Sequence, residues 1–482
     1  MQSTPSDWQQ VEAVFQRIWG YNRFRPPQGE IVQTLLQGSD ALVIMPTGGG
    51  KSICFQLPAL LQRGLTLVIS PLVALMENQV SELHDRNLPA ATLHNELPSR
   101  QRRQVMADLE QQRLRLLYLS PETLLSLPVW QRLCNPALKL NGLVLDEAHC
   151  LVQWGETFRP AYQRLGAVRQ ALLRVRGEGA AIAIAAFTAT ADPTAQRCLK
   201  TTLQLHQPQV VRLSPYRANL DLSVQQVWTL RGRQQRVLST IQAQGSSAGL
   251  VYVRTRRDSE ALAQWLKQQG FRCAAYHAGL TPQERRRLEG DWIQDRLQFV
   301  VSTSAFGMGI NKSAVRWVIH YHAPTLLSEY VQEVGRAGRD GKPACALTLV
   351  SEPTGWLDGT DKQRASYFQQ RHQKLKQQAQ QIARQIPAEG TVAAVSRQFK
   401  QGAIALAHLH RLGQLQWIDP FNYRLVSGVS KPLSPENNSS QTMRHYLYSR
   451  QCRWQTLLDQ FGFRADAQRL QRCGHCDNCQ RS

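Results

Sequence analysis

The stretch Ala41-Leu-Val-Ile-Met45-Pro-Thr-Gly-Gly-Gly-Lys51-Ser52 decides the fold class of this 482-residue chain. An apolar run typical of a buried strand leads into a glycine-rich loop, and the loop leads into a helical pattern. Backbone amides and a helix N-terminus in this order hold phosphate groups. Met45 stands where the general pattern has glycine, but the Gly-Lys-Ser core is intact. We therefore expect an α/β fold with a site for nucleotide phosphates.

The loop itself supplies the candidate nucleotide-binding residues. Lys51 would contact the β- and γ-phosphates of ATP, and the hydroxyl of Ser52 would bind Mg²⁺. The remaining candidates would offer backbone amides to the phosphates: Thr47, Gly48, Gly49 and Gly50.

Further apolar, β-rich runs follow in two series that alternate with helical patterns. The first series includes residues 65–69, 115–119 and 142–146, and the second begins at residue 249 and continues to residue 320. Continuous apolar runs of this length are typical of parallel strands that are buried on both faces. We predict two α/β lobes, residues 1–210 and 211–352, each built on a parallel sheet.

An acidic pair follows the strand-like run that ends at Leu145. Asp146 can hold Mg²⁺ through water, and Glu147 beside it can orient and polarise the water that attacks the γ-phosphate. An Asp-Glu pair alone would often be an ordinary surface feature. Together with the phosphate loop, the pair indicates an ATPase site.

Two arginines in the second lobe are candidates for the same reaction. Arg336 and Arg339 are three residues apart, so they would share one face if the segment is helical. Either side chain could reach charge that develops on the γ-phosphate when the two lobes close. The competing interpretation is a pair of surface arginines that cap a helix.

The pattern changes after Val350. A proline-free Gln/Lys/Arg-rich stretch, residues 362–386, predicts a connecting helix that ends at Pro387. Two short helical patterns and two β-rich runs then follow up to residue 426, which is the order of a helix-turn-helix with a β-wing. We assign residues 353–430 to this connecting helix and winged-helix-like DNA-binding module. A plain helical spacer is the alternative.

The last segment, residues 431–482, contains a cysteine cluster. Cys473, Cys476 and Cys479 form two consecutive Cys-x₂-Cys spacings, and Cys452 adds a fourth thiol from a stretch that we read as helical. Four thiolates suit a closed tetrahedral Zn²⁺ site, which would be structural. His475 could replace one cysteine, and an iron–sulfur cluster is the rival, although no Cys-Pro follows the last cysteine.

Composition limits the partners of the chain. The formal net charge is +22, and residues 360–482 hold 18 Lys/Arg against 7 Asp/Glu, a net charge of +11. Such an excess favours a polyanionic partner and binding that weakens steeply with salt, but it does not separate DNA from RNA. The other six cysteines are scattered, and no apolar run is long enough to span a membrane. We expect a cytoplasmic, reduced protein.

These motifs resemble those of the superfamily 2 helicases, and several segments narrow the resemblance to the RecQ family. The resemblance covers residues 14 to about 350 and resumes from Met443 to Cys479. The segments that carry it are residues 21–28, 45–52, 70–79, 146–150, 187–191, 276–280 and 306–312. It implies two RecA-like lobes that use ATP and Mg²⁺ to unwind duplex DNA with 3′→5′ translocation in recombination and repair, with single-stranded and duplex DNA as partners.

The resemblance also implies roles for individual residues. Tyr21 would stack on the adenine, Gln28 would bond its edge, and Arg25 would lie nearby. The run from Gln153 to Tyr162 looks like the aromatic-rich loop of the family, which couples single-stranded DNA to hydrolysis. Its candidate residues are Trp154, Phe158 and Arg159.

Zinc ligands at the four cysteines are a further implication of the resemblance. It also implies that the chain is a short form without the C-terminal helicase-and-RNase-D-like domain.

Two departures from the family pattern affect these expectations. Glu156-Thr157 stands where the family usually has His-Asp, which affects the efficiency of DNA-stimulated hydrolysis. The aromatic side chains of the loop could also simply plug the lobe surface. The wing-like module precedes the zinc cysteines, whereas the family usually places its winged helix after them.

Two other functions compete with DNA unwinding. An RNA helicase of the same superfamily would share the ATPase machinery, but the aromatic-rich loop and the zinc segment favour DNA. An ATP-driven switch or clamp without unwinding would not need the complete set of candidate catalytic residues. We also expect the two motor lobes to fold without the zinc segment.

Overall fold

The computed structural model describes residues 8–153, 159–177, 179–306, 312–352, 354–426 and 439–480, without the side chains of residues 365, 368, 372, 439 and 440. It divides into two compact units. The first contains residues up to 213 together with 373–435, and the second contains residues 214–372 together with those from 436 onward. Each unit therefore combines two stretches of the chain that are distant in sequence.

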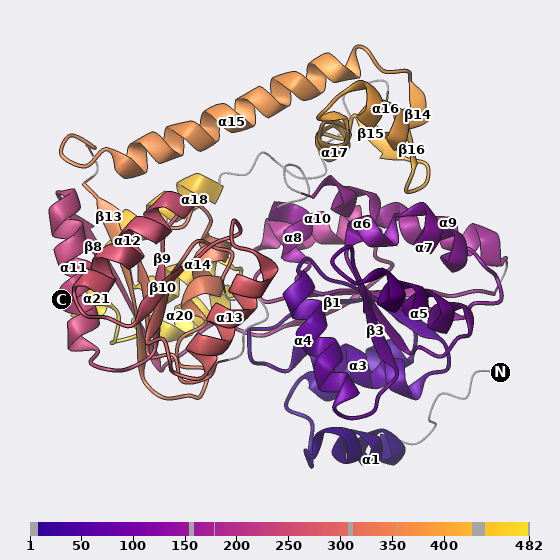
Figure 1. Ribbon diagram of the computed structural model, residues 1–482, viewed down its shortest axis with the longest axis horizontal. Coiled ribbons are helices and arrows are strands. Elements are labelled where there is room, and N and C mark those ends of the chain that lie inside the picture. Colours follow the sequence, from indigo (N-terminus) through magenta and orange to yellow (C-terminus); the bar gives the residue numbers. More distant parts are fainter. Residues whose placement is uncertain are drawn as a thin grey trace. The chain divides into compact units, whose positions relative to one another are not determined.

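A parallel sheet forms the centre of the first unit (Figure 1). Within the described residues it has seven strands in the order β3-β4-β2-β5-β6-β1-β7. Their bounds are β1 (Ala41–Ile44), β2 (Leu65–Ile69), β3 (Ala90–Leu93), β4 (Leu116–Leu119), β5 (Leu140–Leu145), β6 (Ala183–Thr188) and β7 (Gln209–Arg212).

The sheet of the first unit lies between two apolar clusters, and every residue of β1 and β4 is buried. Burial on both faces explains why these strands read as continuous apolar runs. The helices around the sheet are α1 (Trp8–Trp19), α2 (Gln28–Leu36), α3 (Lys51–Leu61), α4 (Val73–His84), α5 (Ser99–Glu110), α6 (Pro121–Leu124), α7 (Leu127–Leu133), α8 (His149–Gln153), the 3₁₀ helix η1 (Pro160–Arg164), α9 (Gly166–Arg176) and α10 (Pro193–Thr202).

A second parallel sheet forms the centre of the second unit. In the described part of the chain it has six strands in the order β10-β11-β9-β12-β13-β8. They are β8 (Leu220–Val227), β9 (Gly249–Tyr252), β10 (Cys273–Tyr276), β11 (Phe299–Ser302), β12 (Trp317–His320) and β13 (Ala344–Ser351). The helices are α11 (Leu230–Ala243), α12 (Arg256–Gln268), α13 (Pro282–Ile293) and α14 (Leu327–Val334).

The two parallel-sheet lobes confirm the predicted fold class, but several strands lie outside the predicted runs, among them β3, β7, β8 and β13. β8 alternates buried and exposed residues, so it lacks the continuous apolar run of an interior strand. It pairs along its whole length with β13 at the edge of the sheet. The sheet of the second lobe therefore begins at Leu220, within the predicted lobe but before the first predicted run at Gly249.

A small module with the order of a winged helix follows the long helix α15 (Thr360–Ala383) (Figure 1). It consists of β14 (Glu389–Thr391), α16 (Val392–Gln398), α17 (Gly402–Arg411), β15 (Leu415–Trp417) and β16 (Asn422–Leu425). The three strands form an antiparallel sheet in the order β14-β16-β15. The module belongs to the first unit.

The zinc segment belongs to the second unit and consists of α18 (Ser439–Tyr448), α19 (Arg453–Gln460), α20 (Arg464–Leu470) and α21 (Asp477–Gln480). Its buried side chains, among them Tyr446, Trp454 and Leu457, share one apolar cluster with Leu220 and Tyr330 of the lobe. This packing argues against the expectation that the motor lobes fold without the zinc segment, because removing it would expose the core of the second lobe to water.

Candidate functional site

The predicted phosphate loop connects β1 to α3, as its sequence pattern requires. Gly48 and Gly50 have φ angles of 86° and 77°, in the left-handed region that favours glycine. A β-carbon on Gly50 would lie 2.4 Å from Nε2 of Gln28, so a side chain there would displace the Gln28 amide. Gly50 is the N-cap residue of α3, which begins at Lys51. The loop therefore leads into the positive end of a helix dipole.

The candidate adenine-binding segment lies directly against this loop. Gln28 is buried, and its Nε2 donates to the carbonyl oxygen of Gly49 at 3.0 Å. Its Oε1 accepts from the backbone N–H of Arg25 at 3.0 Å. An amide has a second N–H and further acceptor capacity, so a base edge can still bond Gln28. Tyr21 is 52% exposed, which leaves a ring face open for stacking.

The acidic pair lies at the carboxyl end of β5, in the same sheet as the strand that carries the phosphate loop. Oδ1 of Asp146 accepts from the backbone N–H of Glu147 at 3.0 Å, and Oδ2 accepts from Nε2 of Gln79 at 3.0 Å. Nζ of Lys51 lies 3.9 Å from Oε1 of Glu147. The structure therefore brings Lys51, Asp146 and Glu147 together.

Burial strongly affects Asp146. Its pKa is raised to about 6, first by desolvation and then by the charge of Glu147, while Lys51 and Gln79 act in the opposite direction. A buried carboxylate of this kind is costly in the ionised form and is a good ligand for a cation. The donor set of Asp146 and Ser52 fits the oxygen chemistry of Mg²⁺.

His149 completes the acidic site, although the sequence interpretation gave it no role. Its Nδ1 lies 3.2 Å from Oε2 of Glu147 and 3.2 Å from Oγ1 of Thr188. Thr188 ends β6, the strand between the phosphate loop and the acidic pair. Glu147 has a φ of 50°, so a strained turn directs its carboxylate, and His149 contacts that carboxylate.

The two candidate arginines of the second lobe lie in a turn instead of a helix. α14 ends at Val334, so the helical-face argument does not apply to Arg336 and Arg339. Both side chains line a small cavity together with Lys312 and Trp292. Arg336 is only 8% exposed, and its charge opposes the effect of burial on Tyr252, whose pKa is raised to about 12.

A buried ion pair holds the helix that precedes these arginines. Arg254 donates to both carboxylate oxygens of Glu333 on α14, at 3.2 and 2.9 Å. His320 lies 3.0 Å from the same carboxylate. These contacts lower the pKa of Glu333 to about 2, with Arg254 the largest lowering influence against desolvation. The Arg254–Glu333 pair therefore fixes the end of α14, and the turn that carries Arg336 follows this helix end directly.

The predicted DNA-coupling residues are only partly described. Trp154 and Phe158 lie outside the described residues, as do Glu156 and Thr157. Arg159 lies directly before η1, with its Nη1 3.5 Å from Oε2 of Glu122.

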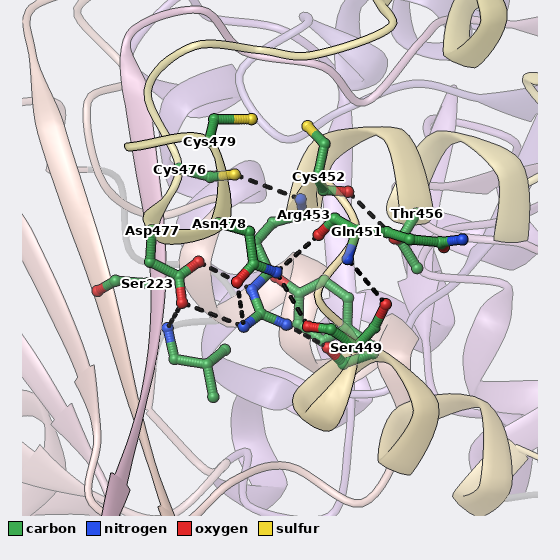
Figure 2. A network of polar contacts seen from close by, with 12 residues as sticks. Ser223, Ser449, Gln451, Cys452, Arg453, Thr456, Cys476, Asp477, Asn478 and Cys479 are labelled. Carbon is green, nitrogen blue, oxygen red and sulfur yellow. Dashed lines mark hydrogen bonds and ion pairs between the residues drawn. The ribbon is translucent and has the colours of Figure 1, made fainter. Parts of the chain in front are cut away.

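The four predicted zinc ligands come together in the second unit, and Figure 2 shows Cys452, Cys476 and Cys479 among them. The sulfur atoms of Cys452, Cys473, Cys476 and Cys479 all lie within 4.8 Å of one another. Cys452 is the N-cap residue of α19 and lies outside the helix in which the sequence pattern placed it. His475 is engaged elsewhere, with Nδ1 2.9 Å from Oδ1 of Asp221.

Backbone N–H groups already point at the sulfur cluster. Cys473 and Cys476 donate to the sulfur atoms of Cys452 and Cys473, each at 3.3 Å, and Arg453 donates to the sulfur of Cys476 at 3.4 Å. Such bonds stabilise negative charge on thiolates, and four thiolates at these distances require a cation between them. The donor set therefore fits a closed zinc site.

A buried ion pair supports the cluster from beneath, as Figure 2 shows. Arg453 donates to Asp477 at 2.9 and 3.1 Å, and Oδ2 of Asp477 accepts from the backbone N–H of Val224 in β8 at 3.1 Å. Tyr446 donates to the hydroxyl of Tyr330 in α14 at 2.8 Å. The zinc segment thus bonds to both an edge strand and a helix of the second lobe.

Within the described ranges, no helix is long and apolar enough to cross a membrane.

Three family profiles match the chain. The profile described as DEAD/DEAH box helicase matches residues 25–198, and Helicase conserved C-terminal domain matches residues 232–341. The profile described as RecQ zinc-binding matches residues 429–480. The three matches leave out residues 342–428, which include α15 and the winged-helix-like module.

Curated relatives share this arrangement to different extents. The chain is 52% identical to the ATP-dependent DNA helicase RecQ of Synechocystis over 98% of its own length and 99% of the relative. It is 39% identical to the Haemophilus influenzae protein of the same name, over 72% of this chain and 54% of that protein. The probable ATP-dependent DNA helicase RecS of Bacillus subtilis is 36% identical over 70% of this chain and 66% of that protein.

Solved structures support the fold of the two lobes. The helicase Lhr of Mycobacterium smegmatis, bound to single-stranded DNA and AMP-PNP, is similar with a TM-score of 0.58 and 23% identity, over 71% of this chain and 48% of Lhr. The DEAD-box helicase Mss116, bound to single-stranded RNA, has a TM-score of 0.58 with 18% identity, over 71% of this chain and 73% of that protein. At these identities the likeness concerns the fold alone.

Proposed function

The chain belongs to the RecQ family of ATP-dependent DNA helicases, and from this premise we propose that it hydrolyses ATP in its first lobe to unwind duplex DNA with 3′→5′ polarity. The single observation that carries the proposal is the convergence of Lys51, Asp146 and Glu147 at one edge of a parallel sheet. Recombination and repair are the processes that the family membership favours.

Each residue of the site has a proposed task. The backbone amides after Pro46 and the Lys51 ammonium bind the phosphates of ATP, and Glu147 orients the attacking water. His149 and Thr188 fix the Glu147 carboxylate through the contacts described above. When bound, Mg²⁺ would neutralise charge on the β- and γ-phosphates, and Ser52 and Asp146 would hold it.

The roles of the second lobe and of the adenine segment rest on the same premise. We assign Arg336 and Arg339 to charge stabilisation on the transferred phosphoryl group, on the basis of the family membership. Tyr21, Arg25 and Gln28 would recognise the adenine. The aromatic-rich loop with Trp154, Phe158 and Arg159 would couple DNA to hydrolysis.

We also propose a division of labour along the chain. Residues 1–210 bind ATP, residues 211–352 form the second motor lobe, residues 353–430 carry the winged-helix-like module, and residues 431–482 hold structural zinc. The location in the cytoplasm rests on the DNA substrate and on ten cysteines that are all free of disulfides.

Two substitutions test the ATPase site directly. Lys51→Ala removes a phosphate contact, and Glu147→Gln removes the carboxylate that orients water while keeping the shape of the side chain. Both should nearly abolish hydrolysis, while binding of single-stranded DNA persists. Arg397→Ala, an exposed position on α16, is the control and should hydrolyse ATP normally. Hydrolysis at the parental rate by either site variant would contradict the assignment.

A further inference from the structure

The second helix of the winged-helix-like module is covered along its whole length. In a helix-turn-helix this second helix enters the major groove of DNA. Here every residue of α17 is buried or half-buried, whereas α16 exposes most of its residues. Each residue of the helix that the fold would normally present to DNA is therefore at least partly covered by protein.

The first lobe supplies part of that cover. Nδ1 of His410, at the end of α17, lies 3.2 Å from Oε1 of Gln163 in η1. The next residue, Arg411, donates from Nη1 to the carbonyl oxygen of Val152 in α8 at 3.3 Å. Gln163 is fully buried and also donates to the carbonyl oxygen of Leu151 at 3.1 Å, so it connects η1 to α8.

Apolar contacts also join the winged-helix-like module to the first lobe. Phe421 of the module meets Trp130 of α7 edge to face, with 5.2 Å between the ring centroids, and packs on the core of the first lobe. Ala167 of α9 lies in the apolar core of the module in return. Arg164 and Arg174 donate to the carbonyl oxygens of Pro420 and Ile418 at 3.2 and 3.4 Å. The module is therefore a docked part of the lobe.

The docking contacts fall on both sides of the segment 154–158. α8 ends at Gln153 before that segment, and η1 begins at Pro160 after it. α8 also begins at His149, whose ring contacts the Glu147 carboxylate. The end of α17 thus holds the two flanks of this segment, and one flank continues directly into the acidic site.

We propose that the winged-helix-like module is a positioning element, docked through α17 on the first lobe so that α8 and η1 hold fixed places during DNA-coupled ATP hydrolysis. The proposal rests on the proposed function. It assigns α17 to an intramolecular interface, in place of the DNA contact that the second helix of a helix-turn-helix makes.

Two variants of the full-length protein weaken the interface from opposite sides. Phe421→Ala with Arg411→Ala removes the ring contact with Trp130 and the hydrogen bond to Val152, and neither side chain belongs to the buried core of the module itself. Trp130→Ala removes the partner ring on the lobe. Arg397→Ala is the control, because it removes the same charge as Arg411→Ala from an exposed position on α16.

Hydrogen–deuterium exchange reports the docking independently of activity. Amides of residues 149–153 and 161–164 should exchange faster in both interface variants than in the parent or in Arg397→Ala, since local opening becomes easier. The ratio of DNA-stimulated to basal hydrolysis should fall about fivefold in both variants, at the lower end of typical coupling between sites.

Three outcomes separate this inference from the proposed function. Unchanged exchange in both interface variants would overturn the inference, because the module would not order the flanks. Faster exchange with an unchanged or increased stimulation ratio would overturn it as well. If the parent shows no DNA-stimulated hydrolysis, the proposed function fails, while the exchange data still decide whether docking orders α8 and η1.

Discussion

Arg453→Met should destabilise the second unit strongly and release zinc. The Arg453–Asp477 pair is almost completely buried, with 4% and 6% of the two side chains exposed. Breaking a buried pair from one side leaves an uncompensated charge and costs about 3–5 kcal/mol. Solvent screening does not reduce this figure at such low exposure. The variant also loses the cation that lies over the ring of Tyr446.

The size of the effect can be converted into a melting temperature. The second unit comprises residues 214–372 and 436–482, and in a domain of this size each kcal/mol shifts the midpoint by about 2–4 °C. The transition of the second unit should therefore fall by about 6–20 °C in calorimetry. Loss of zinc to a chelator should accelerate in parallel, because the Arg453–Asp477 pair joins the residues next to Cys452 and Cys476.

Two control variants test whether the unpaired buried charge causes the fall in melting temperature. Arg450→Met removes the same charge from an exposed position three residues earlier and should change the midpoint little. Adding Asp477→Asn to Arg453→Met removes the orphaned charge and should recover part of the loss. A shift of about 2 °C or less for Arg453→Met would refute the reasoning, since the zinc segment would then contribute little to the stability of the second lobe.

Two further predictions concern the motor. The pKa of Asp146 is raised to about 6, and Mg²⁺ binding requires its carboxylate, so Mg²⁺ affinity measured by titration of the nucleotide-bound protein should fall as the pH drops below about 6 and level off above it. Asp146→Asn should lose that pH dependence; a parental profile in this variant would exclude Asp146 as its origin. Trp154→Ala should lower DNA-stimulated hydrolysis more than basal hydrolysis in a coupled ATPase assay. An equal proportional loss of both rates would instead indicate that the Trp154 ring only packs on the lobe surface.

Local sequence patterns predicted most of the ATPase site. Lys51 and Asp146 both follow apolar strands, and parallel strands of one sheet end at the same edge, so the pattern predicts a common edge for the two residues. The strand order, which brings them close along that edge, comes from the structure. The four cysteines were also identifiable, because Cys-x₂-Cys spacings are typical of closed metal sites. Cys452, which lies at a helix N-cap instead of within a helix, shows that spacing alone does not fix element boundaries.

Long-range packing was not predictable in the same way. β8 alternates like a half-exposed strand, and no local signal shows that it pairs with β13. The core shared by Trp454 and Leu220 joins segments more than 200 residues apart, and the docking of α17 on η1 does the same for the module. His149 had a visible position beside Glu147, but its task depends on the folded turn.

Strand displacement tests the central claim most directly. Duplexes of DNA with a 3′ tail, DNA with a 5′ tail and RNA with a 3′ tail should be compared with and without ATP and Mg²⁺, with Glu147→Gln as the inactive control. The account predicts ATP-dependent displacement of the 3′-tailed DNA by the parent protein only. Displacement that favours the 5′-tailed DNA or the RNA duplex, or ATP hydrolysis without displacement of any duplex, would contradict it.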